Sequence, residues 1–86
     1  MDVKEFHEEL KKVGLSLLWE VDKKKLAVWN PNFANPLLWM DAYEEDYKGN
    51  VRVKSINAPL FTEEQIRKAL ILSDEFLQTP LEDRGL

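Results

Sequence analysis

Residues 15–43 read LSLLWEVDKKKLAVWNPNFANPLLWMDAY and carry all three tryptophans of the chain, Trp19, Trp29 and Trp39, spaced ten positions apart. Each tryptophan belongs to a short apolar run, and residues that favour turns separate these runs. Short apolar runs bounded in this way are typical of β-strands. The stretch therefore predicts a β-meander at the centre of the fold. The predicted strands span about residues 15–22, 25–30 and 37–43.

The first hairpin of this meander has a preferred register. If Trp19 lies opposite Val28 and Val21 lies opposite Leu26, one face of the hairpin carries only apolar side chains. A three-residue loop would instead set Glu20 beside Val28, and a half-buried sheet resists such a slip by one residue. The preferred register places Trp19 on the main core face and Trp29 on the reverse face. We therefore expect Trp19→Ala to cost about 3–5 kcal/mol, as for a buried aromatic residue, and Trp29→Ala to cost much less.

A helix is predicted on each side of the meander. The first spans about residues 2–13, because its apolar residues recur three and four positions apart and Asp2 with Glu5 can form a capping box. The second spans about residues 63–78, where Thr62 and Gln65 form another capping box and Thr79-Pro80 ends the helix. Residues 51–56 alternate apolar and basic side chains, which indicates a fourth strand at the sheet edge.

These elements predict one α+β domain over residues 1–86: a helix, a three- to four-stranded antiparallel meander, a helix and a short C-terminal turn. The order resembles in outline the double-stranded RNA-binding domain, over most of the chain and in topology alone. Such domains place basic residues at the start of the second helix, whereas residues 62–65 here read TEEQ. The resemblance therefore implies the arrangement of elements and does not carry RNA binding to this chain.

Composition limits the classes of function. The chain has 86 residues, a net charge of −4 and no cysteine, so disulfides, thiolate nucleophiles and cysteine-ligated metals are excluded. The negative charge disfavours general binding to nucleic-acid phosphates. The sequence holds no run of about 20 apolar residues for a membrane span and no secretory h-region after its charged start. We expect a cytoplasmic protein without a membrane anchor.

Residues for catalysis or metal binding do not form a recognisable pattern. The only histidine, His7, lies on the polar side of the first helix, so a solvated helix histidine is the preferred interpretation. The acidic residues Asp41, Glu44, Glu45 and Asp46 lack the ligand spacing and the glycine of a calcium loop. The sequence therefore predicts no catalytic residue, no metal site and no cofactor. A hydrolase with paired carboxylates would need a pocket in which acidic residues distant in the sequence lie close together in the fold.

A surplus of apolar residues gives the main functional hypothesis. Trp29, Phe33, Ile71 and Leu72 cannot all reach one two-layer core, and large exposed apolar patches usually mark interfaces. The first hypothesis is therefore a non-catalytic protein-interaction module or accessory protein that binds a partner protein or a second copy of itself. In the alternative arrangement, one helix packs across the second face of the sheet and buries Trp29 inside the monomer. The sequence favours neither arrangement, because two helices are available to cover two faces.

The alternative hypothesis is binding of single-stranded nucleic acid. Bases stack on exposed aromatic rings beside cationic side chains, and Trp29 and Phe33 would form this platform. The phosphates would then meet Lys23, Lys24, Lys25, Arg52 and Lys54. The sixteen acidic residues of the chain argue against this hypothesis.

Overall fold

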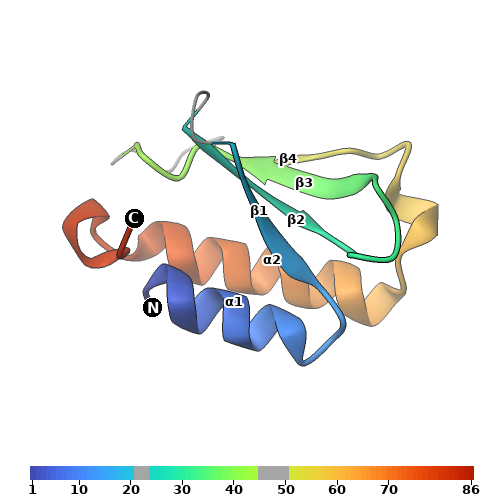
Figure 1. Cartoon of the computed structure of the whole chain (residues 1–86), viewed down its shortest axis with the longest axis horizontal. Helices are drawn as coiled ribbons and strands as arrows, with labels where there is room; N and C mark the ends of the chain where they lie inside the picture. The colour runs from blue at the N-terminus through green and yellow to red at the C-terminus, as the bar shows by residue number, and fades with distance from the viewer. Residues whose placement is uncertain (21–23, 45–50) are drawn as a thin grey trace.

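A four-stranded antiparallel sheet lies on one side of two helices in this computed structural model (Figure 1). The structure describes residues 1–20, 24–44 and 51–86. The elements in chain order are α1 (Val3–Lys11), β1 (Ser16–Glu20), β2 (Lys25–Trp29), β3 (Pro36–Met40), β4 (Val51–Val53), η2 (Ala58–Leu60), α2 (Glu63–Gln78) and η3 (Leu81–Asp83). This order confirms the predicted α+β class, with a helix, an antiparallel meander, a second helix and a short C-terminal turn.

The third and fourth strands each end three residues before their predicted ends, whereas the starts of all four strands and the end of β2 lie within one residue of the prediction. The third strand ends at Met40, not at Tyr43. The fourth ends at Val53, not at Ile56, because the chain turns there: the Asn57 amide donates to the Lys54 carbonyl at 2.9 Å. The sheet order is β1-β2-β3-β4, so β1 and β4 are its edges.

The register of the first hairpin differs from the predicted one by two residues. Leu17, not Trp19, pairs with Val28, and Trp19 pairs with Leu26. Among the described residues, the pair at the end of β1 is Glu20 with Lys25, which have opposite charges. A shift of two keeps every side chain on its predicted face, because side chains alternate with a period of two. Val21, which was expected opposite Leu26, lies outside the described residues.

The strand pleat divides the sheet into a face that packs on the helices and an outer face. Leu17, Leu26, Val28, Leu38 and Met40 lie on the first face and belong to the core. Trp19 shares this face by parity, yet 40% of its surface is exposed. Its predicted burial is therefore wrong. Trp19 lies near the end of edge strand β1, whereas Leu17, on the same strand and face, is buried.

Local signals begin and end both helices. Asp2 and Glu5 form the predicted capping box of α1, and Thr62 and Gln65 form that of α2. Gly14 follows α1 with a φ of +79°, a conformation that favours glycine. The helices pack through the rings of Phe6 and Phe76, which stack with centroids 4.8 Å apart. Both rings are fully buried in the core.

The C-terminal segment is part of the fold, although its sequence predicts only a turn and a polar tail. Arg84 is 1% exposed, and its guanidinium lies 5.8 Å from the centre of the Phe76 ring. Its side chain donates hydrogen bonds to the backbone carbonyls of Leu77, Thr79, Ala42 and Glu44, at 2.7–2.9 Å. The Arg84 carbonyl in turn accepts from the Val3 amide at 2.7 Å. This arginine therefore joins the end of α2, the exit from β3 and the start of α1.

Candidate interaction surface

The structure places the four residues of the predicted interaction surface in different environments. Phe33 is 45% exposed in the β2–β3 loop, and Trp29 is half-buried at the end of β2. Ile71 is 48% exposed on α2, where it lines a hollow between the two helices, whereas Leu72 is in the core. Ile71 and Leu72 are adjacent in the sequence and were both predicted to lie on the interaction surface. In the structure, only the first of them offers surface to a partner.

A group of four exposed apolar side chains belongs to two segments that meet at the end of the sheet where β3 begins and β4 ends. Two hydrogen bonds hold its two segments together: the Asn57 side-chain amide donates to the Pro36 carbonyl at 2.9 Å, and the Lys54 amide donates to the Leu37 carbonyl at 2.8 Å. The β2–β3 loop and the β4–α2 connection meet at this end in Figure 1. We call the cluster the end patch. Its members are Phe33 (45% exposed), Val53 (43%), Ile56 (85%) and Leu60 (42%).

The β2–β3 loop has a defined conformation that keeps Phe33 away from the core. The side-chain oxygen of Asn30 accepts from the Asn32 amide, and its backbone carbonyl accepts from the Phe33 amide, both at 2.9 Å. Asn residues favour such turns because their side chains bond to the backbone two residues on. Asn30 itself is buried, so it anchors the loop. Phe33 is therefore exposed to solvent on a turn that the hydrogen bonds of Asn30 hold in one conformation.

The indole nitrogen of Trp29, at the start of this loop, is buried without a hydrogen-bond acceptor in the described part of the chain. A buried N–H without a partner costs roughly 1–3 kcal/mol. Trp29 is therefore only partly available to a ligand, and its ring is less suited to base stacking than the sequence suggested.

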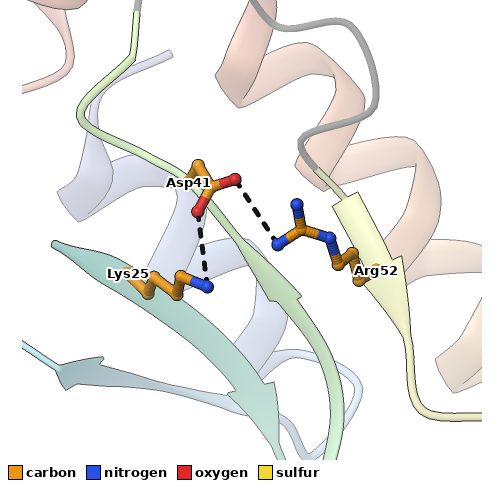
Figure 2. A network of polar contacts seen from close by, with 3 residues as sticks. All are labelled: Lys25, Asp41 and Arg52. Carbon is orange, nitrogen blue, oxygen red and sulfur yellow. Dashed lines mark ion pairs between the residues drawn. The ribbon is translucent and has the colours of Figure 1, made fainter. Parts of the chain in front are cut away.

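The cationic residues of the nucleic-acid hypothesis do not form a continuous track among the described residues. Lys25 and Arg52 both approach Asp41, with nitrogen–oxygen distances of 3.7 Å, so an acid lies between the two bases (Figure 2). Lys24 and Lys54 are exposed, and Lys23 lies outside the described residues. This local alternation of charge would repel part of a phosphate backbone as well as attract it.

The outer face of the sheet carries a row that runs from Leu18 through Ala27 and Trp39 to Arg52. Both helices lie on the opposite side of the sheet (Figure 1). Ala27 is fully buried yet outside the main core cluster, which fits coverage by its larger neighbours on this row. Leu18 is 36% exposed and Trp39 is half-buried. The outer face therefore carries two partly exposed apolar side chains, Leu18 and Trp39, beside the charged Arg52.

His7 has a contact that the sequence did not suggest. Its Nε2 atom lies 2.9 Å from Ser16 Oγ, and its ring meets Trp19 edge-on at 6.1 Å between centroids. Burial and the nearby Lys11 lower the pKa of His7, against an opposing effect of Glu8. A nucleophilic serine needs a third group to orient its base, and the described residues place none on the other ring nitrogen. The pair therefore fastens α1 to the β1 edge.

The described residues include neither a cluster of metal-binding side chains nor a helix able to span a membrane. These residues contain no group of three or more His, Cys, Asp or Glu side chains arranged to hold a metal ion. The helices that they form are too short or too polar to cross a membrane. Comparisons with protein-family models, curated proteins and solved structures find no match to this chain.

Proposed function

We propose that this protein is a non-catalytic protein-interaction module that binds a partner protein through the end patch. The observation that carries the proposal is the exposure of Phe33, Val53, Ile56 and Leu60 at one end of the sheet. Exposed apolar residues that occur singly are ordinary, whereas grouped ones mark interaction sites. Ile56 is the clearest member, because 85% of its surface meets solvent in the free chain.

The energetics support a role for these side chains in binding. Complete burial of an isoleucine or phenylalanine side chain contributes about 1.5–3 kcal/mol. A few fully desolvated anchor residues near the centre of an interface typically supply most of its affinity. Phe33 has little conformational freedom to lose on binding, because its loop is already closed by Asn30. The patch therefore combines exposed apolar area with a preformed backbone.

The partner is a different protein or a second copy of this chain, and we place the protein in the cytoplasm. The absence of cysteine suits a reducing compartment. The single-stranded nucleic-acid hypothesis has less support, because Asp41 lies between Lys25 and Arg52. Tryptophan fluorescence during titration with an oligonucleotide at low salt tests that hypothesis directly, and we expect no quenching.

Site-specific photo-crosslinking tests the proposal. A photoreactive phenylalanine analogue replaces Ile56 or Phe33 in the cell, and the same analogue at Ile71 is the matched control, since Ile71 is exposed to a similar degree as Phe33. We expect discrete adducts from positions 56 and 33 and none of the same mass from position 71. Equal labelling at all three positions, or no adduct at 56 and 33, would overturn the proposal. An adduct of twice the chain mass identifies self-association, which sedimentation equilibrium then checks.

A further inference from the structure

Resting on this proposed function, we propose that β4 accepts an extended peptide segment of the partner as a fifth antiparallel strand. The peptide would alternate acidic and apolar residues. The acids would lie beside Arg52 and Lys54 on the outer face of the sheet, and the apolar residues would lie beside Val51 and Val53 on the helix-facing side. The proposal follows from the hydrogen-bond pattern of β4, the pleat of the strand and its charge.

The hydrogen-bond pattern leaves the backbone groups of two valines pointing away from the sheet. Val53 pairs with Leu38, and the Lys54 amide donates to the Leu37 carbonyl at 2.8 Å. In an antiparallel ladder, this bond makes Val53 a member of a non-hydrogen-bonded pair, so its own N–H and C=O point outward. Val51 is two residues away and has the same orientation. Because β4 is the last strand of the sheet, these groups form a template for one more strand.

The pleat and the charges of β4 specify the side chains of the added strand. Arg52 shares the outer face with Trp39, whereas Val51 and Val53 share the helix-facing side with Met40 and Leu38. An added strand repeats this alternation, because cross-strand neighbours lie on the same face. The side chain of Arg52 is 63% exposed, and its Nη1 atom lies 3.7 Å from Asp41 Oδ2. The guanidinium therefore has room for a second carboxylate. Acidic residues therefore suit the outer face of the peptide and apolar residues suit its inner side.

The same charges argue against a second copy of this chain as the occupant. Antiparallel pairing of β4 with β4 of another copy would bring Arg52 and Lys54 next to the same basic residues of that copy. Like charges in cross-strand positions destabilise a pair. The opposite edge of the sheet is less suitable for strand addition, because His7 of α1 bonds there to Ser16 of β1. The structure thus favours β4 and a separate acidic, apolar segment.

Nuclear magnetic resonance titration tests strand addition. The ¹⁵N-labelled protein is titrated with a soluble heptapeptide that alternates valine and glutamate. Two control peptides are used: one with lysine in place of glutamate, and one with N-methyl groups on the amides that would face β4. We expect saturable shifts of the Val51 and Val53 amide signals with the glutamate peptide alone. Equal shifts with either control, or no shift at millimolar glutamate peptide, would overturn strand addition.

Variants of β4 sharpen the test. Arg52→Glu should weaken binding of the glutamate peptide by roughly fivefold to thirtyfold and favour the lysine peptide, whereas Lys24→Glu should change binding less than twofold. Val53→Pro removes an outward N–H at an edge position where proline is tolerated, so the peptide should no longer shift the Val51 amide signal. If Val53→Pro unfolds the chain, Arg52→Glu still decides. If Arg52→Glu binds the glutamate peptide with unchanged affinity, the preference for an acidic peptide is refuted.

The two proposals fail in different ways. Adducts from Ile56 together with no peptide binding at β4 would refute strand addition and leave the interaction module standing. Absence of both adducts and peptide binding would refute both.

Discussion

Replacement of Arg84 by methionine should remove a large part of the stability of this domain. Methionine keeps much of the length of the side chain but removes the donors to four backbone carbonyls, two of which are those of Ala42 and Leu77. Hydrogen bonds from a charged donor contribute about 1.5–3 kcal/mol each, but they are not additive within one group. Each buried carbonyl that loses its donor costs about 1–3 kcal/mol. Because such costs are not additive within one group, we expect a total loss of about 3–5 kcal/mol.

The expected loss can be compared with the stability of the whole domain. For 86 residues, about 0.05–0.15 kcal/mol per residue gives roughly 4–13 kcal/mol. Arg84→Met should therefore bring the domain close to unfolding at room temperature, and Arg84→Lys should lie between it and the native chain, because an ammonium has only three donors.

Urea denaturation followed by circular dichroism measures the change, with Arg67→Met on the exposed side of α2 as the matched control. We expect the control to lie within about 0.5 kcal/mol of the native chain. If Arg84→Met loses less than about 1 kcal/mol, the desolvation of the guanidinium offsets its hydrogen bonds and the reasoning is refuted.

Three further changes test other parts of the fold. Trp19→Ala should cost about 1–2 kcal/mol in urea denaturation, because Trp19 is 40% exposed, whereas Phe76→Ala should cost about 3–5 kcal/mol; equal losses would contradict the edge position of Trp19. Burial and Lys11 lower the pKa of His7, so the folded chain disfavours its protonation. Its contribution to stability should therefore be full above about pH 6.5 and fall as the pH drops toward the folded pKa. The decline in unfolding free energy between pH 7.5 and 5.5 should be smaller in His7→Gln, and the same decline in both chains would contradict this role of His7. Gly14→Ala should lower the melting temperature, at a cost of about 1–2 kcal/mol, because φ is +79° there; an unchanged or higher melting temperature would show that the helix end relaxes.

Local sequence determined the secondary structure of this chain. The capping boxes at Asp2 and Thr62, and Gly14 after α1, act within a few residues, so their signals are visible without knowledge of the fold. The alternation in the first hairpin predicted the face of each side chain. A register error of two residues left these faces unchanged, because the pleat repeats every two residues.

The tertiary structure alone decided how much of each side chain is buried and which distant residues meet. Trp19 and Leu17 share the predicted face of edge strand β1, yet Trp19 is exposed and Leu17 is buried. Arg84 is buried because carbonyls at the end of α2 and carbonyls of the remote segment after β3 converge on it, and no local pattern encodes that convergence. The end patch unites Phe33 with Ile56, 23 positions later in the chain, through the bond from Asn57 to Pro36. Burial and proximity depend on contacts between remote segments, whereas caps, turns and pleats depend on neighbours along the chain.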